Sequence, residues 1–152
     1  MTANTVCPKT GALMHRSLRP TTLTYKNESI TFDMPGWYCD ECDEGIHTGK
    51  DMQVSDRMLN RLKASSEGLL APEEIQRIRK KLRLSQEAAG LLISGGPRAF
   101  QKYESSDMLP SRAVSSALVL LDHDPEALAV LKRRQVAIKP PAPSHAATPN
   151  NL

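Results

Sequence analysis

Three cysteines, two of them in the motif Cys39-Asp40-Glu41-Cys42, lie in the first third of this 152-residue chain. The segment Cys7-Pro8-Lys9-Thr10 has the form of half of a second such motif, with threonine in place of its second cysteine. Two CxxC turns point four thiolates inward, which suits a tetrahedral zinc ion. Aromatic residues make up only 4% of the chain, so a small module gains needed folding energy from a metal. We therefore predict a zinc-knuckle-like module with Cys7, Cys39 and Cys42 as ligands.

The fourth ligand of this knuckle is left open by the sequence. A neutral threonine such as Thr10 is a poor zinc ligand. His15 or His47 can take its place if the fold brings either imidazole near the thiolates. In the alternative, hydrogen bonds and apolar packing hold the knuckle together without a metal. A redox role for the CxxC is less favoured, because no βαβ pattern accompanies it.

Residues 1–68 have the pattern of an α+β module with a small antiparallel sheet. Alternating β-branched and aromatic residues predict about three strands, followed by a helix. The strands are expected at 21–25, 30–32 and 37–39, and the helix at about 50–64. The polar turn at 26–29 separates the first two strands, and Pro35-Gly36 precedes the third. The small polar residues 64–68 are interpreted as a linker.

Residues 69–135 have apolar residues at helical spacing almost throughout, which predicts an all-α domain of about five helices. Their starts are marked by Pro72, by Ser85 as a cap, by Pro97, by Ser111 and by Pro125. Ser94-Gly95-Gly96-Pro97 breaks the chain between the second and third helices. The proline-rich residues 136–152 lack any apolar period and are predicted to be a disordered tail.

The net charge of +3 is unevenly distributed. Residues 1–68 carry 8 basic and 9 acidic side chains, whereas residues 69–152 carry 12 basic and 8 acidic ones. The second module is therefore the one expected to meet phosphates. No apolar run approaches the 18 residues of a membrane span, and the N-terminus lacks a secretory pattern. We expect a cytoplasmic protein, in which disulfides are disfavoured.

The third predicted helix of the second domain is typical of a helix that reads DNA. If Ala99, Phe100 and Tyr103 face the core, the residues left outside are Arg98, Gln101 and Lys102. Arginine can pair with both guanine acceptors, and glutamine can pair with adenine. Three further residues, expected to contact phosphates, are Gln86, Lys80 and Lys81. A helical bundle with a merely polar face is the alternative.

Two stretches, Leu84-Ser85-Gln86-Glu87-Ala88-Ala89 and Ala99-Phe100-Gln101-Lys102-Tyr103-Glu104, resemble the Xre-type (Cro/C1-type) helix-turn-helix. The wider pattern resembles the MqsA (YgiT-type zinc finger) antitoxins over about residues 5–131. It comprises an N-terminal knuckle, a CxxC after a hairpin, Arg79-Lys80-Lys81-Leu82, the Gly95-Gly96 break and the final helices from Leu120 to Leu128.

This resemblance implies an antitoxin of a type II toxin-antitoxin system that also represses its own operon. In the family, the N-terminal zinc-binding module neutralises a small ribonuclease toxin, usually MqsR. The C-terminal domain dimerises and binds an operator palindrome. By position, Cys7, Cys39 and Cys42 match three zinc ligands, and Thr10 stands at the fourth. Arg98 and Lys102 stand where the family often has asparagine and arginine, so a different operator sequence is expected.

Two other functions are alternatives to an antitoxin. A stand-alone Xre-type regulator, whose N-terminal module senses metal or binds a protein other than a toxin, has the same sequence features. An enzyme is disfavoured, because no nucleophile with His/Asp partners and no phosphate-binding glycine loop is evident. A homodimer is expected because DNA recognition needs two half-sites. Its candidate surface residues, unless they are core, are Val114, Leu118, Leu121 and Leu128.

Overall fold

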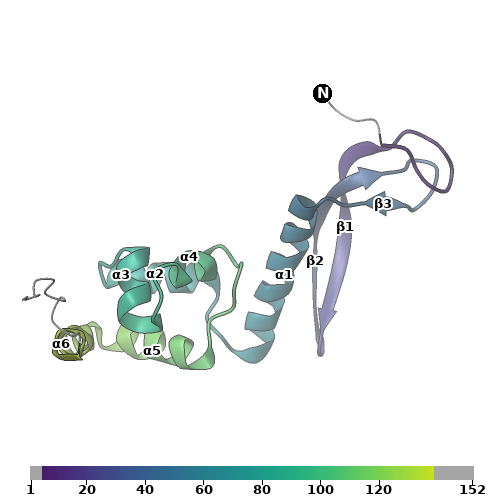
Figure 1. Ribbon diagram of the computed structural model, residues 1–152. Coiled ribbons are helices and arrows are strands. Elements are labelled where there is room, and N and C mark those ends of the chain that lie inside the picture. The colour runs from purple at the N-terminus through teal and green to yellow at the C-terminus, as the bar shows by residue number, and fades with distance from the viewer. Residues whose placement is uncertain (1–4, 139–152) are drawn as a thin grey trace, which may run out of the picture.

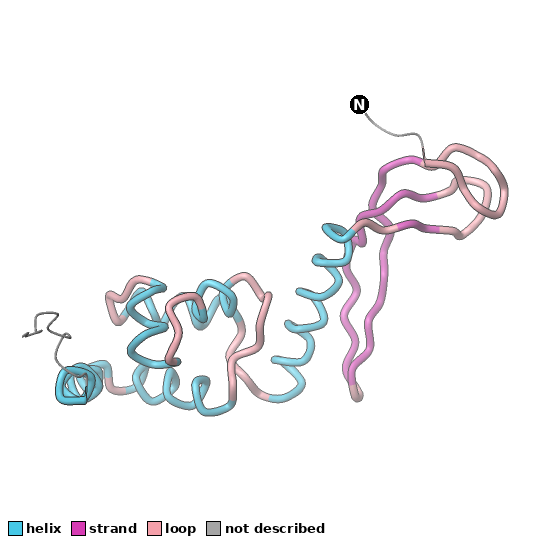
Figure 2. The backbone as a smooth tube through the Cα atoms, in the orientation of Figure 1, coloured by secondary structure: helices cyan, strands magenta, loops and turns pink. Residues whose placement is uncertain are grey.

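The computed structural model describes residues 5–138, in which a β-hairpin module is followed by a set of helices (Figures 1 and 2). The antiparallel sheet has the order β1-β2-β3. Its strands are β1 (His15–Tyr25), β2 (Glu28–Tyr38) and β3 (Gly45–Ile46). The helices are α1 (Gly49–Glu67), α2 (Pro72–Lys81), α3 (Gln86–Ala89), α4 (Ala99–Glu104), α5 (Arg112–His123) and α6 (Leu128–Ile138). A π-helical turn, η1 (Gly90–Ser94), extends α3, and a 3-10 turn, η2 (Pro125–Ala127), precedes α6. The predicted fold class is confirmed.

The hairpin is longer than the sequence pattern indicates, and its third strand lies elsewhere. The segment 37–39, predicted as a separate strand, continues β2 through Tyr38, and the third strand is Gly45–Ile46. Pro35-Gly36 does not interrupt β2, because β3 pairs only with Trp37 and Tyr38. At Pro35, β2 therefore has a partner strand on one side only, where a residue without an amide hydrogen is tolerated.

Helix α1 joins the two modules without the predicted linker. It begins at a capping box, in which the Thr48 hydroxyl accepts the Asp51 amide and the Asp51 carboxylate accepts the Thr48 amide. It ends at Gly68, which adopts a left-handed φ of 69°. The interpretation of 64–68 as a linker is wrong, because residues 64–67 are helical and Ala64 is buried.

The helical domain is organised around one aliphatic core with two aromatic rings. Phe100 and Tyr103 of α4 meet edge to face, 5.5 Å between ring centroids. The buried residues of this core are Ile75, Ile78, Leu82, Leu84, Ala89, Phe100, Tyr103, Leu118, Leu121 and Leu128. Three of the candidate dimer residues, Leu118, Leu121 and Leu128, thus belong to the core, and Val114 is partly buried against it.

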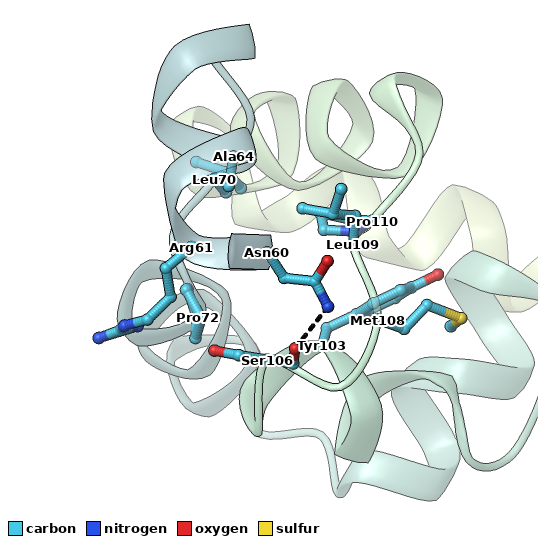
Figure 3. A pocket seen from close by; sticks show the side chains of 10 residues that line it. All are labelled: Asn60, Arg61, Ala64, Leu70, Pro72, Tyr103, Ser106, Met108, Leu109 and Pro110. Atoms are coloured by element: carbon cyan, nitrogen blue, oxygen red, sulfur yellow. Dashed lines mark hydrogen bonds between the residues drawn. The ribbon is translucent and has the colours of Figure 1, made fainter. Parts of the chain in front are cut away.

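The second half of α1 packs on the helical domain. Asn60 donates a 2.8 Å hydrogen bond to the carbonyl oxygen of Ser106, and Figure 3 shows this bond at the junction. Arg57 reaches Asp107 through two hydrogen bonds of 2.7 and 3.3 Å. The pocket between these elements has a volume of about 10 Å³, close to the minimum for one water. The junction is therefore closely packed.

Two predictions concern the C-terminal end. Helix α6 runs to Ile138, so the predicted tail of residues 136–152 begins with three helical residues. Residues 139–152, the remainder of that prediction, lie outside the described part of the chain.

No helix within residues 5–138 is both long enough and apolar enough to cross a lipid bilayer.

Candidate functional site

The three cysteines predicted as metal ligands converge at the end of the sheet. Cys7 lies in the loop before β1, and Cys39 and Cys42 lie in the turn between β2 and β3. Their sulfur atoms all lie within 4.8 Å of one another. The Cys7 and Cys42 sulfurs are 3.6 Å apart. The amides of Lys9 and Glu41, two residues after Cys7 and Cys39, each point at the preceding sulfur at 3.4 Å. Both segments thus form the expected knuckle.

Thr10 lies at the fourth corner of this cluster, and neither candidate histidine does. The Thr10 hydroxyl oxygen is 3.4 Å from the Cys39 sulfur and accepts a 3.2 Å hydrogen bond from the Ala12 amide. His15 instead lies 3.5 Å from Asp40, and His47 Nδ1 lies 2.9 Å from the Pro35 carbonyl oxygen. The structure therefore does not bring either imidazole to the thiolates.

The donor set suits a zinc-like ion. Cys7 and Cys39 are buried and Cys42 is half-buried, so the sulfurs are screened from solvent. The hydrogen bond from the Thr10 hydroxyl, helped by nearby backbone amides, lowers the pKa of the Cys7 thiol to about 6. A thiol must be deprotonated to bind a metal, so this environment favours the metal-binding form of Cys7, whereas the pKa of the Cys42 thiol is raised. The three cysteines are positioned to bind a metal ion.

The second candidate site is the outer face of α4. Arg98, Gln101 and Lys102 are exposed, while Phe100 and Tyr103 on the opposite face are buried. The predicted division of this helix between a core face and an outer face is therefore observed. Arg98 immediately precedes the first turn of α4, the end that carries free amide groups. These features are those of a helix that can enter a DNA groove N-terminus first.

A buried polar network fixes α4 against its neighbours, and sequence reasoning missed it. The Arg79 guanidinium donates to both carboxylate oxygens of Glu104, at 2.6 and 3.0 Å, and to the Leu84 carbonyl oxygen at 2.9 Å. Gln86 donates to the same carboxylate at 3.1 Å. The network thus joins α2, α3 and α4. Their arginine, glutamine and glutamate are visible in the sequence, but only the fold shows that they meet.

The predicted phosphate-contacting residues have different environments. Lys80 is exposed, with its side chain available. Lys81 donates to the carboxylate and the carbonyl oxygen of Asp122, at 2.9 and 2.8 Å. Gln86 is half-buried and bonded to Glu104. Contact with a phosphate would therefore require Lys81 and Gln86 to share or leave their present partners.

The turn between α3 and α4 depends on one glycine. A Cβ on Gly90 would lie 1.9 Å from the Gly96 carbonyl oxygen, a distance that no side chain can occupy. The Gly96 amide donates to the Gly90 carbonyl oxygen at 3.0 Å, which closes the turn. This close backbone approach sets the distance between the two helices and hence the position of the outer face of α4.

The sequence profile described as "Antitoxin component of bacterial toxin-antitoxin system, MqsA" matches residues 4–132. The chain belongs to the MqsA antitoxin family. Antitoxin MqsA of Escherichia coli (strain K12) is 35% identical to it over 97 residues, which cover 61% of this chain and 72% of that protein. The MqsA match spans both the cysteine cluster and α4, so both candidate sites lie within the family region.

Proposed function

We propose that this chain is the antitoxin of a type II toxin-antitoxin pair, which neutralises a ribonuclease toxin through its N-terminal module and represses its own operon. The observation that carries the repressor function is the exposed set Arg98, Gln101 and Lys102 on a helix held rigid by the Arg79–Glu104 pair. A rigid helix with exposed hydrogen-bonding side chains is suited to direct base readout. DNA binding is thus assigned to α4.

A gel-shift assay with the DNA upstream of the chain's own operon, at a fixed stated salt concentration, tests this assignment. The Arg98→Ala plus Lys102→Ala double variant is expected to lose specific binding. Each lost bidentate base contact costs about 1–3 kcal/mol. The Lys50→Ala plus Lys63→Ala double variant removes the same charge from α1 and is expected to bind like the parent. Undiminished binding by the α4 variant contradicts the assignment.

Toxin neutralisation is assigned to the hairpin, where β1 forms an edge of the sheet. An unpaired strand edge can pair with a strand of another protein. Leu18 on this strand is 59% exposed although it is apolar. The free edge and this exposed leucine support a protein-binding surface that is separate from α4.

Co-expression with a neighbouring toxin-like gene separates the two functions. Leu18→Asp is expected to abolish rescue of growth and to leave operator binding unchanged. The Arg98→Ala plus Lys102→Ala variant is expected to show the reverse pattern. If the neighbouring gene causes no growth arrest, or if Leu18→Asp rescues fully, the toxin assignment fails. In the first case the stand-alone Xre-type regulator becomes the better description.

We also infer a homodimer, in which α5 supplies the contact. Val119 and Leu120 of α5 are exposed, Leu120 by 69%, and they border a shallow groove of about 330 Å³ together with Gly68 and Arg112. A second copy covering these residues would supply the second recognition helix that an operator with two half-sites requires. Leu120→Arg is expected to yield monomers in analytical ultracentrifugation, whereas Met52→Arg, at an exposed methionine of α1, is not. Dimers of Leu120→Arg contradict this surface.

Zinc is the metal that we propose for the cysteine cluster, because thiolate ligands at this spacing favour it. Metal analysis of protein purified without added metal is expected to give close to one zinc per chain. A stoichiometry near zero contradicts the proposal.

A further inference from the structure

The metal cluster combines three thiols with one alcohol at its corners, Thr10 being the alcohol. We propose that the Thr10 hydroxyl oxygen is the fourth ligand of the metal, so that the site has three sulfurs and one exchangeable oxygen position. This inference rests on the zinc centre proposed above, and it is independent of DNA and toxin binding.

One sulfur–sulfur and one sulfur–oxygen distance in the cluster agree with a tetrahedron of this composition. With Zn–S near 2.3 Å and Zn–O near 2.0 Å, tetrahedral angles place two sulfurs about 3.8 Å apart and a sulfur and an oxygen about 3.5 Å apart. The observed separations are 3.6 Å for Cys7 and Cys42, and 3.4 Å between the Cys39 sulfur and Thr10 Oγ1. The hydroxyl oxygen thus lies at the distance expected of a fourth ligand from the Cys39 sulfur.

Other oxygen and nitrogen donors near the cluster are held elsewhere. Across residues 5–138, no imidazole nitrogen or carboxylate oxygen joins the three sulfurs. Glu44, in the same turn as Cys42, is paired with Lys9 at 2.9 Å. His47 contacts the carbonyl oxygen of Pro35. Thr10 is therefore the side chain that the fold supplies.

Burial explains why the oxygen position would exchange. Cys7 and Cys39 are buried, whereas Thr10 is exposed, so the cluster is screened on its sulfur side and open to solvent at its oxygen corner. A neutral hydroxyl is a weaker ligand than a thiolate. A water molecule or a small external thiol can therefore replace it while the three cysteines retain the ion.

Cobalt(II) titration of the full-length protein, under reducing and oxygen-free conditions, tests the proposal. Three variants of the exposed Thr10 are compared: Thr10→Ser keeps the oxygen, Thr10→Val keeps the shape without it, and Thr10→Cys adds a thiolate. The thiolate-to-cobalt charge-transfer intensity of the parent is expected to be about three-quarters of that of Thr10→Cys. Thr10→Ser should match the parent. Thr10→Val should shift the d–d bands and bind more weakly against a chelator, and Thr10→Cys should bind about tenfold or more tightly.

Two further variants serve as controls, because they remove an oxygen donor and a nitrogen donor that are bonded to other partners. His47→Ala and Glu44→Gln are expected to leave cobalt spectrum and affinity unchanged. The proposal is overturned if Thr10→Val has the parent's band positions and affinity for cobalt. It is also overturned if a control variant shows the loss of cobalt affinity that is expected of Thr10→Val. A parent protein that binds no cobalt at all overturns the zinc centre as well, so the two failures are distinguishable.

Discussion

Arg79 and Glu104 form an ion pair whose side chains are only 11% and 6% exposed, and each of the three guanidinium nitrogens donates one hydrogen bond to a protein oxygen. Arg61 and Glu73 form a pair of the same chemistry at the surface, where the glutamate side chain is 67% exposed. Solvent screens the second pair, and water hydrates either charge if the pair is broken. A buried charge that loses its partner is not hydrated in this way.

Removing one carboxylate from each pair should therefore have unequal effects. We expect Glu104→Gln to lower the free energy of unfolding by about 3–5 kcal/mol. Glu73→Gln, the control, should change it by less than about 1 kcal/mol. Urea denaturation followed by circular dichroism measures both. Equal effects of the two substitutions would show that burial of the first pair has no energetic consequence.

The stability contributed by Asp51 should depend on pH. This carboxylate is 3% exposed, and its pKa is lowered first by the Arg16 guanidinium and then by the Thr48 amide. Its folded-state pKa lies below the unfolded value of about 3.9. The contribution is therefore complete above that value and is lost as the pH falls toward the folded-state pKa. Parent and Asp51→Asn should differ in unfolding free energy at pH 7, and the difference should begin to shrink only below about pH 4. A constant difference would contradict this.

Most helix starts could be predicted, because they depend on local chemistry. Ser85 and Ser111 each accept the amide three residues on, as their positions before apolar periods predict. The ends of elements were harder to predict. Whether β2 passes Pro35 depends on how far β3 extends, and the end of α1 depends on its packing against the second domain. Neither is encoded in neighbouring residues.

At the scale of the elements, the turn between α3 and α4 should tolerate a methyl group at Gly96 but not at Gly90. Gly90→Ala would place its Cβ against the Gly96 carbonyl oxygen, and we expect the free energy of unfolding to fall by about 1–3 kcal/mol or more. Gly96→Ala meets no atom within 4 Å and serves as the control. Thermal unfolding should show a lower Tm for Gly90→Ala alone. An equal Tm for both variants would mean that the turn can rearrange without cost.

At the scale of the whole molecule, the sequence predicts most of the site residues, but it does not predict which other residues they contact. The cysteines were predicted from their spacing, and the outer face of α4 was predicted from helical periodicity. The engagement of Lys81 was missed because its partner, Asp122, lies 41 residues away in the sequence. The boundary between modules at residue 68 is likewise crossed by contacts such as Asn60 to Ser106.

These contacts predict that the helical domain is incomplete without α1. A fragment of residues 69–138 should have a lower Tm than a fragment of residues 48–138, because it loses the Asn60 hydrogen bond and the packing of Ala64. Asn60→Ala in the longer fragment should reproduce part of the decrease, whereas Lys50→Ala, near the other end of α1, should not. Equal Tm values of the two fragments would mean that residues 48–68 add nothing to the stability of the helical domain.

Helix α1 is continuous over 19 residues, which corresponds to a length of about 28 Å. Its first turn is bonded to the hairpin through Arg16 and Asp51, and its last residue, Glu67, is bonded to the other end of the hairpin through Tyr25. Its second half is also bonded to the helical domain, through Asn60. The hairpin and α1 are therefore joined along the whole length of the helix and should move as one unit. A tilt of this unit by about 10° about the first turn of α1 moves the last turn by about 5 Å, more than half the depth of a DNA major groove.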